Sequence, residues 1–420
     1  MPAGGAVPLA DYLASVLSRL RALPPLDLDL TEAYGNVLAE DVVAPHSYPA
    51  FDQAAIDGYA ARWEDIAGAG YDGSGRAGVR LNVVGDLGAA SWRPVRLTPG
   101  TCFSVAAGAP LPVSADVVVP VEWTDQGMAV VEIFRAPKRG SGVRRAGSEL
   151  PAGTLLAQAG TPISPALVAG LAATGIGYVV VQPSPRVVIV ATGDELVEVG
   201  RGSQPGQVVD INSHALTAAV VEAGAVAYRV GMCDDDPEGL RALLEDQAPR
   251  ADLIITTGGT GTGPGDILRR VLSRRDGKRS SPVVFTDVAL YPGAALGFGT
   301  FGAEEVPIVC LPGEPGTALI GFEVLARPAI QLLAGAEPVF RPGVRAHLLE
   351  TISSPAGLRE FRPAYVAERR GGGYTVQPLP GGPFTLSGLA EANGLLVLGE
   401  RITTAPAGST VDVLLLDRRR

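Results

Sequence analysis

Lysine, cysteine, histidine and aromatic residues are all scarce in this chain of 420 residues. It has three cysteines and three histidines, scattered along the sequence, and no two cysteines stand in a C-x-x-C spacing. We therefore expect neither a disulfide framework nor a zinc site. Aromatic residues make up 5% and charged residues 19% of the chain, but hydrophobic residues make up 46%. This composition excludes a disordered chain and predicts a globular, loop-rich protein.

Positive charge is also in short supply. Lysine and arginine together number 34 against 44 acidic residues, which gives a formal net charge of −10. Only Lys138 and Lys278 are lysines. This balance argues against a nucleic-acid partner or a basic membrane-surface protein, and an anionic ligand would need donors placed locally.

A long segment without charge, Leu150 to Pro185, is the one stretch that resembles a membrane span. It exceeds the ~20 residues that cross a bilayer, but prolines and glycines break it into short pieces. We expect it to be buried core. The first residues lack the basic-then-apolar pattern of a secretory signal, so we expect a cytoplasmic protein without membrane insertion.

The first half of the chain predicts two subdomains, one inserted in the other. Leucines at helical spacing from Leu9 predict an amphipathic helix that ends at Pro24. Short apolar runs between glycine and proline turns predict a β-rich inserted subdomain over 46–139. We expect the opening helix to pack on the segment without charge. This would form one discontinuous helical and β subdomain, 1–45 and 140–182, with a dimerisation or linker role.

In the second half of the chain, short apolar runs alternate with segments whose apolar residues recur at helical spacing. Arg186–Ala191, Leu253–Thr256 and Val306–Leu311 are short β-branched runs, and helices are predicted after them. Repeated βα units predict an α/β subdomain over 183–335 with a doubly wound, mostly parallel sheet. Asn212 is expected to cap its first helix. Runs that alternate apolar with polar residues within 336–420 predict a small C-terminal β subdomain.

Polar, often glycine-rich loops follow four of these predicted strands. They are Thr192–Glu195, Asp234–Asp236, Thr257–Asp266 and Pro312–Thr317. Loops that follow parallel strands share one sheet edge, where open α/β folds bind ligands, so we expect them to converge on one crevice. The glycines of the longest loop suit a phosphate-bearing ligand. Pro264 stands where the lysine of a Walker A motif would be needed, which excludes that motif.

Four carboxylates belong to these loops, those of Asp194, Glu195, Asp235 and Asp266. Together with phosphate oxygens they would make a magnesium site. Taken singly, each is better explained as a helix cap or a solvated acid than as a metal ligand.

Several motifs in consistent order along almost the whole chain carry a family resemblance. They are Phe51–Ala60 (FDQAAIDGYA), Gly108–Pro112 (GAPLP), Thr192–Leu196 (TGDEL), the glycine loop ending at Asp266, Leu311–Gly313 with Pro315, and Ser387–Leu389 followed by Ala392–Gly394. The chain thus resembles the molybdopterin molybdenumtransferase (MoeA) family, which includes the C-terminal domain of gephyrin.

The resemblance implies an elongated homodimer of four-subdomain subunits, with a site shared between subunits. It implies transfer of molybdate onto adenylylated molybdopterin with release of AMP, in the presence of Mg²⁺. Carried over residue by residue, it implies catalytic roles for Asp57, Glu195 and Asp266, with Glu195 and Asp266 also binding the metal. The implied substrate-binding residues are Gly258, Gly259, Thr260, Gly263, Asp235, Pro312, Gly313, Pro315, Glu122, Arg144 and Ser387.

Asp57, Glu122 and Arg144 lie in the first two subdomains, and the resemblance implies that the partner subunit supplies them. Each also has a simpler interpretation. Asp57 precedes Gly58 and would also suit a turn. Glu122 would also suit a surface acid, and Arg144 belongs to a basic run that would normally be solvated.

The chain departs from the family where lysines normally surround a Pro-Gly-Lys-Pro turn. Asp287, Tyr291 and Ala294 stand at those positions. An aspartate beside a dianion replaces attraction by repulsion, worth roughly 1 kcal/mol at 4 Å in water and more in a partly buried site.

Two hypotheses follow from this departure. In the first, the protein is a divergent transferase whose cations are arginines such as Arg269, Arg270, Arg274 or Arg275. In the second, it has kept the fold but lost turnover, and acts as a dimeric scaffold that binds a peptide of another protein near the C-terminal subdomain. Arginines directed into the crevice would favour the first hypothesis, and an acidic crevice would favour the second.

Overall fold

The computed structural model describes residues 5–71, 76–91, 93–202, 204–233, 235–263, 266–273, 282–293, 295–382 and 385–416. The chain divides into two compact units. One comprises Asp27–Tyr34 and Glu40–Val180, and the other comprises Met1–Leu26, Gly35–Ala39 and Val181–Arg420.

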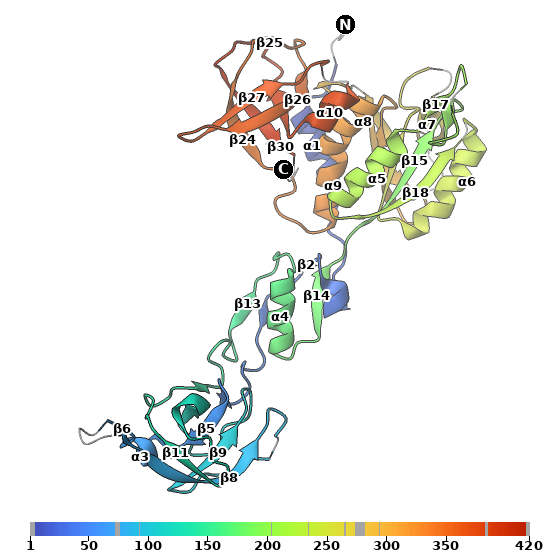
Figure 1. Cartoon of the computed structure of the whole chain (residues 1–420). Helices are drawn as coiled ribbons and strands as arrows, with labels where there is room; N and C mark the ends of the chain where they lie inside the picture. Colours follow the sequence, from blue (N-terminus) through green and yellow to red (C-terminus); the bar gives the residue numbers. More distant parts are fainter. Residues whose placement is uncertain are drawn as a thin grey trace. The chain divides into compact units, whose positions relative to one another are not determined.

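The first unit contains the predicted β-rich insertion (Figure 1). Its main sheet has five strands in the order β10 (Val117–Pro120), β5 (Gly58–Ala61), β9 (Thr101–Val105), β8 (Val79–Leu87) and β11 (Val130–Ile133). Valines of β10 and β11 alternate into a core that also holds Cys102 and Ile66. Short strands form further pairs, among them β12 (Val143–Arg144) with β4 (Gln53–Ala54) and β13 (Leu155–Ala157) with β3 (Val42–Val43).

The opening helix α1 (Leu9–Leu17) packs elsewhere than the sequence predicted. Its buried residues Leu9, Tyr12 and Val16 belong to the core of the second unit, with Ile330 and Leu333. The prediction that α1 covers the segment without charge is therefore wrong. An amphipathic face shows that a helix needs an apolar partner, but it does not say which partner.

The segment without charge contributes β13, helix α4 (Pro165–Ala173) and strand β14 (Tyr178–Gln182). Residues 37 and 38 form β2 (Val37–Leu38), which pairs antiparallel with β14. Within the second unit, residues 181–182 thus pair with 37–38, and the core that contains α1 includes neither segment.

The α/β part of the second unit is built on a six-stranded sheet. The strand order is β18 (Val226–Cys233), β15 (Arg186–Thr192), β19 (Leu253–Thr257), β23 (Val306–Leu311), β22 (Ala295–Phe301) and β20 (Val284–Asp287). The first four are parallel, whereas β22 and β20 add an antiparallel edge.

Both faces of this sheet are covered by helices. Val187 and Ile189 of β15 face a core with α5 (Asn212–Glu222), and Val188 and Val190 face a second core. Helices α6 (Pro237–Gln247) and α7 (Ile267–Leu272) contribute to that second core. Because successive strand residues point to opposite faces, this two-sided burial explains the continuous apolar runs and confirms the doubly wound, mostly parallel sheet.

A long apolar helical stretch follows β23. It consists of α8 (Pro315–Gly321), a π-helical turn (Phe322–Ala326) and α9 (Arg327–Leu333). The Glu314 carboxylate caps its start by accepting from the Gly316 and Thr317 amides at 3.1 and 2.6 Å. Among the described residues, Pro315–Leu333 is the one helix long and apolar enough to cross a membrane, and 72% of its apolar window is buried inside the protein.

The C-terminal residues form the predicted β subdomain. Its sheet order is β21 (Leu290–Tyr291), β26 (Arg359–Glu368), β27 (Tyr374–Pro378), β24 (Gly343–Leu348), β30 (Thr410–Leu415) and β28 (Gly394–Leu398), and β26 also pairs with β28. The sequence predicted a separate subdomain, but β21 comes from the preceding segment, and Phe361 and Leu395 share a core with α1. The remaining subdomain boundaries stay predictions.

Candidate active site

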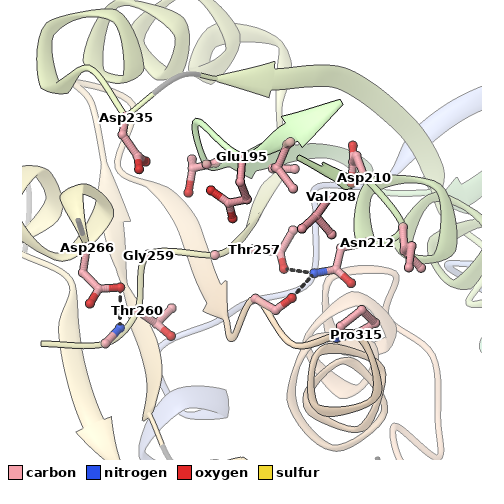
Figure 2. A pocket seen from close by; sticks show the side chains of 18 of the residues that line it. Glu195, Val208, Asp210, Asn212, Asp235, Thr257, Gly259, Thr260, Asp266 and Pro315 are labelled. Carbon is pink, nitrogen blue, oxygen red and sulfur yellow. Dashed lines mark hydrogen bonds between the residues drawn. The ribbon is translucent and has the colours of Figure 1, made fainter. Parts of the chain in front are cut away.

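A cavity of about 470 Å³ lies at the carboxyl ends of the parallel strands (Figure 2). All four predicted loops contribute to its lining: Thr192, Gly193 and Glu195 after β15, Asp235 after β18, Thr257–Gly261 and Asp266 after β19, and Gly313 and Pro315 after β23. The convergence of these loops on one crevice is thus confirmed. Asp234, Pro264 and Gly265 lie outside the described residues.

Glycines let the β15, β19 and β23 ends approach one another closely. Gly258 has φ +94°, and a Cβ there would lie 2.5 Å from the carbonyl oxygen of Thr192. A Cβ on Gly313 would lie 3.3 Å from the Cα of Gly258. Only glycine fits at position 258, since a side chain there would both strain the backbone and collide with it.

Asp266 fixes the glycine loop through its side chain. Its Oδ1 accepts from the Gly261 amide at 3.1 Å, and its Oδ2 accepts from the Gly263 amide at 2.6 Å. Asp266 immediately precedes α7, yet its carboxylate makes no capping bond to that helix. The helix-cap interpretation of Asp266 is therefore wrong, because both carboxylate oxygens bind the loop.

Glu195, Asp235 and Asp266 give the cavity an acidic end, with Asp194 beside it. The Oδ1 of Asp194 accepts from the Asp235 amide at 2.7 Å. Burial, with the nearby carboxylates of Asp194, Glu195 and Asp266, holds the pKa of Asp235 above its usual value. The cavity therefore carries uncompensated negative charge that a bound cation would relieve.

The carboxylates do not form a complete metal cage by themselves. Among the described residues, no group of three or more histidine, cysteine or acidic side chains is assembled closely enough to hold a metal ion. A metal at this end would have to take the rest of its ligands from the substrate or from water, as Mg²⁺ commonly does.

Asn212 lies in the site in a role other than the helix cap that the sequence predicts. Its Nδ2 donates to Thr257 Oγ1 at 2.9 Å and to the Gly313 carbonyl at 2.8 Å. Thr257 Oγ1 in turn donates to the Pro312 carbonyl at 2.9 Å. Since a backbone carbonyl can only accept, the amide orientation of Asn212 is fixed by its partner. Asn212 thus ties the β19 end to the β23 loop.

The expected cap at Asn212 is therefore wrong. Ile211 is the residue at the helix boundary, and it makes no side-chain cap. Asp210 accepts from the Ser213 amide at 3.0 Å instead. The sequence did offer a signal, since Asp210 and Asn212 are both residue types that cap helices and lie within three positions. Because only one of them can cap the helix, the other was free for another role.

Cations do not line the cavity within the described part of the chain, where its charged lining residues are all acidic. Arg269 lies over the Phe285 ring at 5.3 Å and donates to the Gly261 carbonyl at 3.5 Å, so it braces the glycine loop. Arg270 and Asp287 are exposed. Arg274, Arg275 and Ala294 lie outside the described residues.

Other predicted site residues lie around this cavity or away from it. Gly263 and Pro312 belong to its loops without lining it. Tyr291 is half-buried in β21, and Ser387 is exposed in the short helix α10 (Leu386–Glu391).

Asp57, Glu122 and Arg144 belong to the other compact unit. Asp57 Oδ1 accepts from the Ala107 amide at 2.7 Å, and Arg144 forms an ion pair with Glu149. Gly58 pairs with Pro120 at one end of β5 and β10, so Asp57 and Glu122 flank the same strand end. The catalytic and substrate-binding roles of these three residues stay predictions.

Comparisons with known proteins place this architecture in a family. Residues 7–175 match the MoeA N-terminal region (domain I and II), residues 188–332 match a probable molybdopterin binding domain, and residues 345–416 match the MoeA C-terminal region (domain IV). Molybdopterin molybdenumtransferase 1 of Mycobacterium tuberculosis is 39% identical over 408 residues, covering 93% of this chain and 95% of that protein. The chain belongs to the molybdopterin molybdenumtransferase (MoeA) family.

Further members of the family agree with this assignment. Molybdopterin molybdenumtransferase 2 of M. tuberculosis is 37% identical over 399 residues, covering 95% of this chain and 96% of that protein. The crystal structure of the molybdopterin biosynthesis MoeA protein from Pyrococcus horikosii matches with a TM-score of 0.78 and 27% identity, covering 99% of this chain and 100% of that chain. The family resemblance and the fold class predicted from the sequence are both confirmed.

Proposed function

We propose that this chain is a transferase of molybdenum cofactor biosynthesis that inserts molybdate into adenylylated molybdopterin and releases AMP. The two M. tuberculosis relatives, which match this chain over nearly their whole length, are both named molybdopterin molybdenumtransferase. The observation that carries the proposal is the cavity itself, in which a glycine loop and a cluster of acids meet at the edge of the sheet.

Mg²⁺ is part of this proposal, and the residues present fit it. Glu195, Asp235 and Asp266 offer carboxylate oxygens, the donors that Mg²⁺ prefers. Burial and the neighbouring carboxylates raise the pKa of Asp235, and a bound cation would relieve their repulsion. When bound, Mg²⁺ would neutralise phosphate oxygens and polarise the phosphorus they surround. Asp266 would hold the glycine loop and present its remaining lone pairs to the metal.

Magnesium would also supply the positive charge that lysines supply in other members of the family. The acidic end of the cavity would repel a substrate that carries phosphates, and Arg269 is engaged with Phe285 and Gly261. We therefore propose that the metal, rather than a relocated arginine, compensates most of the substrate charge in this member of the family. Substrate binding should then depend on Mg²⁺ more steeply than in relatives that keep lysines.

We further propose that the protein works as a homodimer with Asp57, Glu122 and Arg144 supplied by the partner subunit. Mixed dimers test this idea. Subunits carrying Asp57→Ala and subunits carrying Asp266→Ala should each be inactive alone. If the site is shared, a mixed dimer contains one intact site and regains activity, whereas unshared sites would leave the mixture inactive.

The scaffold hypothesis is not favoured by the named relatives, although the cavity is acidic as that hypothesis expected. A peptide contact near the C-terminal subdomain stays a prediction. A mostly apolar cavity of about 540 Å³ between α1 and strands β26, β28 and β30 is the surface that would receive it. We expect the protein to act in the cytoplasm.

A cellular assay tests the proposed function. The chain is expressed in a bacterial strain that lacks its own molybdenumtransferase, and the activity of a molybdenum-dependent enzyme is measured. Wild-type protein should restore that activity and Asp266→Ala should not. Folded wild-type protein that fails to restore it at ordinary molybdate supply would contradict the proposal.

A further inference from the structure

A short segment after β15 carries Glu195 and forms one wall of the cavity. It contains two strands, β16 (Leu196–Val197) and β17 (Val208–Val209), which pair in parallel, and residues of both line the cavity. The Val208 amide donates to the Glu195 carbonyl at 2.7 Å, so β17 holds the backbone of the acid. Isolated strand pairs are marginally stable in water, so two strands of two residues each need a further tie to the protein.

Arg229 of β18 supplies such a tie. Its guanidinium makes a bidentate pair with Glu198, which directly follows β16: Nη2 donates to Oε1 at 2.7 Å and Nη1 donates to Oε2 at 3.2 Å. The same Nη1 donates to Ser213 Oγ at 3.2 Å and lies 3.8 Å from Oδ2 of Asp210, which directly follows β17. Because a bidentate arginine–carboxylate pair fixes orientation as well as distance, one side chain of the sheet holds the segment at the ends of both short strands.

Burial and charge make this tie stronger than an ordinary surface ion pair. Asp210 is 1% exposed, and it accepts from the Ser213 amide at 3.0 Å and from the Ser213 hydroxyl. Removing a cation from beside a buried carboxylate leaves its charge uncompensated. The hydrogen bond from His214 and the charge of Arg229 hold the pKa of Glu198 below its ordinary value. Both carboxylates are therefore favoured in their charged form beside the arginine.

The pairing of β18 is irregular at this arginine. Ile189 of β15 pairs with Arg229, whereas the next residue, Val190, pairs with Gly231, so Val230 is an extra residue in β18. Gly231 has φ +97°, a conformation that favours glycine. Bulges of this kind twist a strand locally and redirect side chains, and they are frequent beside active sites. The irregularity thus lies at the residue that reaches the cavity wall.

We propose that Arg229 is a positioning residue, which holds β16 and β17 through Glu198 and Asp210 and so fixes Glu195 at the acidic end of the cavity. This inference rests on the proposed function, because it concerns an acid assigned to that reaction. Arg229 itself does not line the cavity, and no motif singled it out.

Arg229→Gln tests the proposal, with Arg186→Gln as a matched control. Arg186 makes a similar bidentate pair with Asp252, at 2.9 and 3.0 Å, but it begins β15 and so lies at the end of the sheet away from the cavity. Glu198→Ala and the double variant Arg229→Gln/Glu198→Ala show whether Arg229 acts through Glu198. Two quantities are measured for each protein: amide hydrogen exchange, and the rate of molybdate-dependent AMP release as Mg²⁺ is varied.

Arg229→Gln should speed exchange about tenfold in peptides that cover 193–202 and 204–212, because it removes charge-assisted hydrogen bonds to that segment. It should also raise the Mg²⁺ concentration at half-maximal rate about tenfold, because a displaced Glu195 would bind the metal less well. Arg186→Gln should leave both quantities within about twofold of wild type. The double variant should be no worse than the more affected single variant, since two residues that act as one unit are not additive.

Several results would overturn the inference. Wild-type exchange in Arg229→Gln would mean that the segment is held without the arginine. Faster exchange with an unchanged Mg²⁺ requirement would leave Arg229 a structural residue only, and equal effects of Arg229→Gln and Arg186→Gln would show a general loss of stability. If the wild-type protein releases no AMP, the proposed function fails. Exchange then decides the inference alone: faster exchange confined to Arg229→Gln supports its hold on the segment, and wild-type rates refute it.

Discussion

Asn212 offers the sharpest test of how the cavity is held together. Its side chain is 9% exposed and bridges the β19 end and the β23 loop with two hydrogen bonds, beside the direct bond from Thr257 to Pro312. Asn212→Ala removes these two bonds, each worth about 1 kcal/mol net. Thr257 keeps its bond to Pro312, and Gly313 is exposed enough for water to replace the lost donor. The local cost should therefore be about 2 kcal/mol rather than more.

Asn212→Asp separates hydrogen bonding from packing. The two side chains have nearly the same shape, but a carboxylate has no donor and would face the Gly313 carbonyl with a negatively charged oxygen. Asn212→Asp should therefore destabilise the two loops at least as much as Asn212→Ala. If Asn212 only filled space, Asn212→Asp would instead behave like wild type.

Amide hydrogen exchange is the suitable assay, because a chain of several subdomains does not unfold in one step. A local loss of about 2 kcal/mol speeds exchange roughly 30-fold in peptides that cover 253–263 and 306–318. Asn393→Ala is a matched control, since Asn393 also makes two side-chain bonds, to the Val366 backbone at 2.7 and 2.9 Å. It should speed exchange in β26 and leave the cavity loops unchanged. Wild-type exchange rates in the cavity loops of Asn212→Asp would refute the reasoning.

Three further predictions concern the loops and the acids. Gly258→Ala should lower the thermal midpoint far more than Gly200→Ala, because both have positive φ but only Gly258 would place a Cβ against a backbone atom; equal shifts would contradict the close approach. Asp235→Asn should raise thermal stability at pH 7 without Mg²⁺, since the raised pKa means that the ionised carboxylate costs stability above that pKa. This gain should shrink as the pH falls toward about 3.9, the ordinary pKa of an unfolded aspartate, and a gain independent of pH would exclude the electrostatic cause. Asp266→Ala should abolish molybdate transfer and loosen the glycine loop while its elution volume on gel filtration stays that of wild type, and unchanged transfer would remove Asp266 from the mechanism.

The α/β subdomain could be predicted closely because its strands are buried on both faces. Runs such as Val187–Val190 are apolar at every position, and the polar loops after such strands must share one edge. The C-terminal strands were equally clear, since Tyr374–Pro378 and Thr410–Leu415 alternate in burial as well as in sequence.

The partner of the opening helix could not be predicted, since its leucines show only that one face is apolar. Leu9 and Val16 pack with residues more than 300 positions away, at Ile330 and Leu333. The role of Asn212 was hidden for a similar reason, because a helix start offers a sufficient local explanation for an asparagine. Its two partners come from loops distant in sequence, so only the fold reveals them.

The charge of the site was only half predictable. The acids were visible as Glu195, Asp235 and Asp266, and they do line one cavity. Whether arginines replace the lysines depends on whether their side chains point into the cavity, which the sequence does not show. Arg269 braces the loop it follows, an arrangement that residue type alone does not disclose.

We propose that the protein inserts molybdate at this acidic cavity, with magnesium in place of the missing lysines. The most direct measurement is AMP release from adenylylated molybdopterin by the purified protein, with molybdate and Mg²⁺ each varied, beside Asp266→Ala. We expect release that requires molybdate, rises steeply with Mg²⁺ and disappears in Asp266→Ala. No release from folded, dimeric wild-type protein, or release that persists without Mg²⁺, would contradict it.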